Sequence, residues 1–184
     1  MIVLQGGSAL SDYQQRKIVS SIQSINKTAT LVECLYYHFV QTTEDLQEPQ
    51  QHILNALFDY ASSAQSGKIS EQFILVVPRF GTISPWSSKA TDIIHNCGLH
   101  EVSRAERGIA YFLDSEQPLT SKELSAIAPH FYDKLTESVL YSFEEAEKLF
   151  YSPQPSALID VALTDDPLTC LQDANETLGL ALSQ

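Results

Sequence analysis

The sequence is poor in basic residues, in cysteine and in long apolar runs, and each shortage argues against a class of protein. It holds 11 Lys and Arg against 23 Asp and Glu, whereas a nucleic-acid-binding module needs clustered basic side chains. Its three cysteines are odd in number and widely spaced, which is typical of reduced thiols. No apolar run approaches the roughly 20 residues of a membrane span, and residues 1–5 lack the basic flank of a secretory signal. We therefore expect a cytoplasmic protein that binds neither nucleic acid nor membrane.

The acidic charge is concentrated in the C-terminal part of the chain. Residues 1–113 hold 8 Lys and Arg against 10 Asp and Glu, whereas residues 114–184 hold 3 against 13. This distribution has two interpretations: solvated helix faces and a linker, or an acidic surface that binds a basic partner domain.

One segment combines a strand, a turn and a well-marked helix start. The apolar, β-branched residues 73–77 predict a buried strand, and the turn at Gly81 follows it. Ser84 stands at an N-cap position, with Pro85 at the first position of the helix. Gly98 is the expected end of this helix.

Helical spacing divides the side chains of this helix between two faces. The face expected to be buried carries Trp86, Ala90, Ile93, Ile94 and Cys97. The face expected to be exposed carries Lys89, Asp92 and Asn96. The helix N-terminus could bind an anion, or the helix could simply be capped and anchored by its tryptophan, with Lys89 and Asp92 as a weak surface pair. No complete phosphate-binding loop motif is present.

The order of the predicted elements indicates an α+β fold. Strands are expected at residues 1–5, 30–40, 73–77 and 101–114, and helices at 11–26, 49–61 and 85–97. Without the helix at 49–61, this order is the ferredoxin-like pattern, a four-stranded antiparallel sheet with both helices on one face. Further helices are expected at 119–128 and 133–150. The second should bury Leu135, Val139, Phe143, Ala146 and Phe150, expose Glu144 and Lys148 as a pair, and be capped by Asp133.

The last part of the chain predicts a linker and one more helix. Pro153 and Pro155 disfavour both helix and central strand. A short strand-like run follows at 157–163, and a final amphipathic helix carries Leu171, Ala174, Leu178, Ala181 and Leu182.

Residues 78–99 closely resemble the N-terminal region of the large, single-chain phosphoribosylformylglycinamidine synthases, also called formylglycinamide ribonucleotide amidotransferases. They read PRFGTISPWSSKATDIIHNCGL. Residues 104–111, 132–134 and 178–182 support the resemblance. It implies a PurS-like, ferredoxin-like domain at 1–151, a linker at 152–168, and the first helix of a following domain at 169–184. The chain would then be a fragment of a larger enzyme of purine biosynthesis.

The same resemblance implies what the chain should and should not do. The whole enzyme converts formylglycinamide ribonucleotide, with glutamine, ATP and Mg²⁺, into formylglycinamidine ribonucleotide. The fragment itself is expected to carry no cofactor, metal or catalytic residue, and to be inactive alone. Its expected partners are the synthetase and glutaminase domains of the same parent chain, and a homodimer of the isolated fragment is plausible. Candidate contacts to those domains are Arg79, Thr82, Ser84, Trp86, Ser87, Ser88, Lys89, Asp92 and Asn96.

Other patterns carry weaker hypotheses. A stand-alone module that binds an anion or a nucleotide at the helix N-terminus, residues 84–87, is the alternative function. His95 and Cys97 are too few for a zinc site. The aromatic residues at 36–39 predict packing within a sheet, since stacking on bases does not fit the acidic charge.

Overall fold

The computed structural model describes residues 1–58, 70–152, 157–158, 160–163 and 165–181. The chain divides into two compact units, Met1–Ser152 and Pro153–Gln184. Within the described ranges, no helix combines the length and the hydrophobicity that a bilayer span requires.

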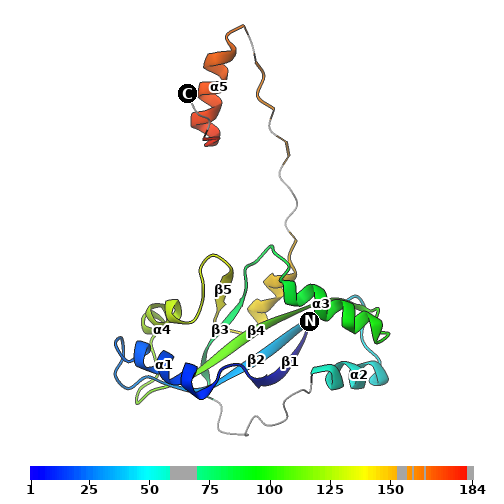
Figure 1. The fold of residues 1–184 in the computed structure, drawn as a ribbon, viewed down its shortest axis with the longest axis vertical. Coiled ribbons are helices and arrows are strands. Elements are labelled where there is room, and N and C mark those ends of the chain that lie inside the picture. Colours follow the sequence, from blue (N-terminus) through cyan, green and yellow to red (C-terminus); the bar gives the residue numbers. More distant parts are fainter. Residues whose placement is uncertain (59–69, 153–156, 159, 164, 182–184) are drawn as a thin grey trace. The chain divides into compact units, whose positions relative to one another are not determined.

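The first unit is built on one antiparallel sheet (Figure 1). Its strands are β1 (Ile2–Ser8), β2 (Thr30–Thr42), β3 (Gln72–Pro78), β4 (Val102–Asp114) and β5 (Glu137–Leu140). Their spatial order is β1-β2-β4-β3-β5, and every neighbouring pair is antiparallel. The long strands β2 and β4 form the centre of the sheet, and a register shift between Gln5 and Ser8 interrupts edge strand β1. The α+β class is therefore confirmed.

The helices of this unit are α1 (Asp12–Ile22), α2 (Glu48–Phe58), α3 (Pro85–Asn96) and α4 (Ser121–Ile127), with two 3₁₀ helices, η1 (Ala128–His130) and η2 (Glu144–Phe150). Three of the α-helices, α1, α3 and α4, begin at residues whose side chains cap them. Ser11 and Gln14 form a capping box at α1, and Thr120 and Glu123 form one at α4. The Ser84 side chain caps α3, with Pro85 at its first position.

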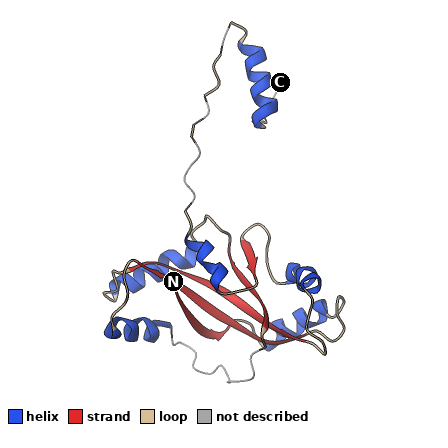
Figure 2. Ribbon diagram, turned by 180° about the vertical axis from the view of Figure 1, so that it is seen from behind, coloured by secondary structure: helices blue, strands red, loops and turns tan. Residues whose placement is uncertain are grey.

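All four α-helices pack on the same face of the sheet, as Figure 2 shows from behind. Alternate residues of a strand share one face, and Cys34 and Val40 of β2 therefore lie on the same side. Cys34 belongs to the hydrophobic cluster under α1 and α4, which includes Ile22 and Ile127. Val40 belongs to the cluster under α2 and α3, which includes Leu54, Phe58 and Ile94. Two pairs of helices thus cover the two halves of one face.

The opposite face is covered by η2 and an aromatic cluster. Leu35, Tyr37 and Phe39 of β2 pack there with Ala146 and Leu149 of η2. The Phe143 ring lies 4.4 Å from Tyr37 and 4.7 Å from Phe73, measured between centroids. The prediction that the aromatic residues at 36–39 pack within the sheet is confirmed, because Tyr37, His38 and Phe39 are buried.

The predicted helix over 133–150 is wrong. Residues 137–140 pair with residues 75–78 as β5, and the chain becomes helical again only at η2. Leu135 is 76% exposed, and Asp133 accepts a hydrogen bond from the Leu135 N–H at 2.8 Å within a turn instead of capping a helix. Lys148 pairs with Glu145, at 2.9 Å, and not with Glu144. Pairing with the free side of β3 outweighs the helical spacing of these apolar residues.

The second unit contains α5 (Pro167–Leu178), which is capped by Asp166, whose carboxylate accepts the Thr169 N–H, and ended by Gly179. The helix therefore stops before Ala181, contrary to the prediction, and Leu182 lies outside the described residues. The described residues of the strand-like run at 157–163 form no strand. Tyr60, expected in the helix at 49–61, lies outside the described residues.

Gly108 of β4 packs tightly against the end of β3. A Cβ atom there would lie 2.8 Å from the Val76 carbonyl oxygen and 2.9 Å from Val77 Cγ1, so a neighbour must shift. Gly108→Ala should lower the free energy of unfolding by about 1–3 kcal/mol, as overpacked cores do. Urea denaturation measures this change. Gly81→Ala is a useful comparison, because a Cβ there would have no neighbour within 4 Å and only the positive φ of 76° adds strain. An unchanged urea midpoint for Gly108→Ala would contradict the tight packing of Gly108 against β3.

Candidate docking site

One side of β4 continues past the end of its neighbouring strand. β3 pairs with β4 only along residues 72–76 and 109–113, so no described strand pairs with residues 102–108 on that side. Helix α3 lies there instead. The Ala105 N–H donates to Thr91 Oγ1 at 3.1 Å, and His95 Nε2 lies 2.6 Å from the Val102 carbonyl oxygen. Side chains of α3 therefore satisfy backbone groups that a strand would otherwise satisfy.

The buried carboxylate of Glu106 fixes the start of this helix. Glu106 is fully buried and forms an ion pair with Arg104, whose Nε donates to Glu106 Oε1 at 3.1 Å. The other donors to this carboxylate are the Ser84 hydroxyl at 2.8 Å and the Ser84 N–H at 3.3 Å. Arg104 Nη2 also donates to the Thr82 carbonyl at 2.6 Å. The turn and the helix N-cap are thus held to β4 by a charged network.

This network bears on the alternative that the helix N-terminus binds an anion. The Ser84 hydroxyl accepts the Ser87 N–H at 3.0 Å and donates to Glu106. Glu106 therefore supplies, from inside the fold, the negative charge that a helix N-terminus favours.

On the helix-covered face of the sheet, aromatic rings surround Arg107. Its guanidinium carbon lies 4.3 Å from the Tyr36 ring centroid and 4.9 Å from the Trp86 ring centroid, both within cation–π range. The His38 ring stacks on Phe58 at 4.4 Å and lies 5.5 Å from Trp86. Burial, and next the charge of Arg107, lower the pKa of His38 to about 4, while a backbone hydrogen bond involving Leu4 opposes the shift. His38 is therefore neutral at pH 7.

The structure places the nine predicted contact residues in three settings. Six are exposed: Arg79, Thr82, Ser88, Lys89, Asp92 and Asn96. Ser84 and Trp86 are half-buried, and Ser87 is buried, with 1% of its surface exposed. Arg79 donates to the Leu135 carbonyl at 3.4 Å, and the Thr82 hydroxyl donates to the Arg79 carbonyl at 2.6 Å. Ser87 is therefore the least accessible of the nine.

The exposed side of α3 forms one continuous surface, which we call the outer strip. It consists of Ser88, Lys89, Asp92, Ile93 and Asn96. Within the part of the chain that the structure describes, the side chains of Lys89, Asp92 and Asn96 make no hydrogen bond or ion pair, so the predicted Lys89–Asp92 pair does not form. The expected burial of two further residues is also wrong, because Ile93 is 55% exposed and Cys97 is exposed. The helix lies beside the sheet edge, and so buries a narrower stripe than predicted.

Four residues of this region were not among the predicted contacts: His38, Arg104, Glu106 and Arg107. The alternating faces of a strand could have predicted part of this arrangement, because a strand places Arg104 and Glu106 on one face, where they can pair, and Arg107 on the other. Nothing in the sequence indicated that Ser84 would meet Glu106, since 22 residues separate them.

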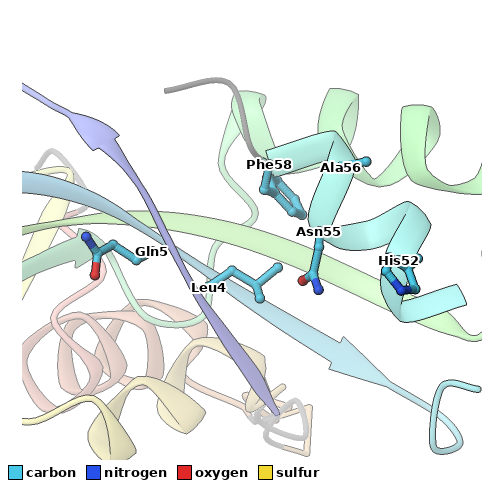
Figure 3. Close-up of a pocket in the computed structure, with 6 residues that line it drawn as sticks. All are labelled: Leu4, Gln5, His52, Asn55, Ala56 and Phe58. Carbon is cyan, nitrogen blue, oxygen red and sulfur yellow. The ribbon is translucent and has the colours of Figure 1, made fainter. Parts of the chain in front are cut away.

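A separate hollow lies between β1 and α2 (Figure 3). It measures about 410 Å³ and is lined by Leu4 and Gln5 of β1 and by His52, Asn55, Ala56 and Phe58 of α2. Among these described lining residues, His52 is the only titratable side chain, so they contain no acid–base pair. In the described ranges, no group of three or more His, Cys, Asp or Glu side chains could hold a metal ion.

The fold and the site together define a small α+β domain. In this domain, helix α3 is hydrogen-bonded to the side of β4 that β3 leaves unpaired, and the outer strip of the helix is exposed to solvent. The model of the family of N-terminal domains of formylglycinamide ribonucleotide amidotransferase matches residues 35–150, and the chain belongs to this family. The match confirms the resemblance stated from the sequence and gives the chain a role in an enzyme of purine biosynthesis. It includes all of α3 and β4, whereas residues 178–182, which also supported the resemblance, lie outside it.

Glu106→Gln tests the charged network. The substitution keeps the shape of the side chain but leaves Arg104, whose side chain is only 18% exposed, without its counter-charge. We expect the free energy of unfolding to fall by about 3 kcal/mol, as when one partner of a buried pair is removed. Glu145→Gln is the matched control, because its exposed pair with Lys148 contributes at most about 1 kcal/mol. Equal effects of the two substitutions in chemical denaturation would contradict the role of Glu106.

The lowered pKa of His38 predicts a pH-dependent stability. In the unfolded chain this imidazole binds a proton near pH 6.5, whereas in the folded chain it stays neutral down to about pH 4. Its contribution to stability is therefore complete above pH 6.5 and is lost as the pH falls towards 4. Between pH 7.5 and pH 5 the loss should reach about 2 kcal/mol. Denaturation of the wild type and of His38→Gln at a series of pH values measures this loss. If the free energies of unfolding of the two proteins changed in parallel with pH, the lowered pKa of His38 would be contradicted.

Proposed function

We propose that this domain couples the glutaminase and synthetase modules of the parent amidotransferase, and that it binds them through the outer strip of α3. The observation that carries the proposal is that the network around Glu106 holds α3 rigidly, while three polar side chains of its outer strip have no partner among the described residues. Rigid elements with unpaired polar side chains suit a specific contact better than mobile loops do.

The chemistry of the parent enzyme gives such a contact a purpose. In this proposal the parent uses glutamine as the nitrogen donor and binds ATP and Mg²⁺ in its synthetase modules. Ammonia released at the glutaminase site has to reach the synthetase site without escaping into water. A domain that packs against both modules contributes by fixing their positions and by excluding solvent from the route.

A coupling role and a purely structural role predict different effects on glutamine-dependent and ammonium-dependent synthesis. Loss of coupling lowers only the first rate, whereas loss of structure lowers both. In the parent enzyme, replacing both Asp92 and Asn96 with Ala should lower glutamine-dependent synthesis at least about tenfold, a loss of about 1.4 kcal/mol in contact energy. Synthesis supported by added ammonium should stay near the wild-type rate, because ammonium bypasses the route. Steady-state assays with each nitrogen source measure both rates.

Lys17→Ala provides the control, since Lys17 is an exposed residue of α1, away from the outer strip. It should leave both rates unchanged. Normal glutamine-dependent synthesis in the Asp92 and Asn96 double variant would refute the proposal, as would an equal loss with both nitrogen sources.

A further inference from the structure

Arg107 is held rigidly, yet its hydrogen-bond donors are free. The ring centroids of Tyr36 and Trp86 lie 4.3 and 4.9 Å from its guanidinium carbon. In the described part of the chain, none of its N–H groups has a hydrogen-bond acceptor or an ion-pair partner. Arg104, two residues earlier, differs in this respect, because it binds Glu106 and the Thr82 carbonyl. Arg107 is thus oriented by stacking and not neutralised by a carboxylate.

A groove beside Arg107 gives these donors access to a partner. It lies between α2 and α3, has a volume of about 340 Å³, and is lined by Leu57, Phe58, Trp86, Lys89, Ile93 and Arg107, among others. The described residues of its lining include two cations and no acidic side chain, although the chain as a whole carries a net charge of −12. The other described lining residues are apolar, so a charge that enters the groove beside them is poorly screened by water.

The hollow on the other side of Arg107 is less suited to an anion. It has a volume of about 270 Å³ and shares Arg107 and Tyr36, but it also contains the carboxylate of Glu137, which accepts the Asp133 N–H at 2.8 Å. A second carboxylate there would meet like charge, which is unfavourable. The groove between α2 and α3 is therefore the side on which Arg107 can bind an anion.

We infer that this groove receives a carboxylate side chain, flanked by an apolar residue, from the partner module that covers α3. The carboxylate forms two parallel hydrogen bonds with the guanidinium of Arg107, the geometry for which a fixed Arg is suited. Lys89 provides a second positive charge at the rim. The apolar flanking residue packs against Trp86 and Ile93.

Continuity with the outer strip identifies a protein segment as the occupant. Lys89 and Ile93 belong both to the groove lining and to the outer strip, so a surface that covers the strip also covers the groove. This inference rests on the proposed function, and it adds the chemistry of the partner surface to it. A free organic anion is the competing occupant that the experiment has to distinguish.

The single tryptophan of the chain reports directly on the groove. The probe is the peptide acetyl-Leu-Glu-Leu-amide, titrated into the ¹⁵N-labelled chain while the Trp86 indole N–H resonance is followed by NMR. Acetyl-Leu-Gln-Leu-amide is the isosteric control. We expect saturable shifts with the Glu peptide at millimolar concentrations and at least about tenfold weaker binding of the Gln peptide, because charge-assisted bidentate hydrogen bonds are lost.

Variants assign the binding to Arg107. Arg107→Gln should weaken the Glu peptide about tenfold, and Arg107→Lys by a smaller factor, because Lys keeps the charge but not the planar fork. Lys89→Gln removes an exposed charge without disturbing the stacked rings, and should weaken binding about two- to threefold. The Lys89→Gln variant therefore still tests the inference if Arg107→Gln does not fold. Lys17→Gln, on α1, should change nothing.

Three results would overturn the inference: equal affinity for the two peptides, unchanged binding in the Lys89→Gln and Arg107→Lys variants, or binding of phenyl phosphate more than about tenfold tighter than the Glu peptide. The last would identify a small organic anion as the occupant. These outcomes are independent of the coupling assay, because that assay changes Asp92 and Asn96, which are not among the residues that line the groove.

Discussion

The arrangement of the candidate docking site depends on one constraint, the unequal lengths of β3 and β4. β4 extends well past the last residue with which β3 pairs, and the backbone groups that it exposes there need partners. Thr91 and His95 provide two of them from α3, and Ser84 joins the same strand through Glu106. A helix bound in this way has a fixed direction and a fixed rotation about its axis. Which of its residues face solvent is therefore set by the sheet.

The same constraint explains the two environments of the basic residues in β4. Successive strand residues point to opposite faces, so Arg104 and Arg107 lie on different sides of the sheet. Arg104 faces a buried carboxylate and is neutralised within the fold. Arg107 faces rings from β2 and α3, which fix its plane without neutralising it. One short segment thus contributes both an internal support and a charged group that is open to a partner.

Much of the fold could be predicted from the sequence where the signals are local. The capping residues Ser11 and Ser84 mark the starts of α1 and α3, and the apolar runs predicted β2, β3 and β4 to within a few residues. The region after residue 133 could not be predicted, because Val139 has helical spacing with its apolar neighbours but is paired with Val76 in β5. Such pairing depends on a strand some 60 residues away. The candidate site divides in the same way: the exposure of Lys89 and Asn96 followed from helical periodicity, whereas the contact of Ser84 with Glu106 depends on tertiary structure.

The outermost strands of the sheet restrict how this domain can associate with others. β1 is broken by an irregularity after Gln5, and β5 is only four residues long. Short or irregular border strands are poor templates for adding a strand from another molecule. Both border strands therefore disfavour association by continuing the sheet, which leaves side chains and surface shape as the features on which a contact with another domain would depend.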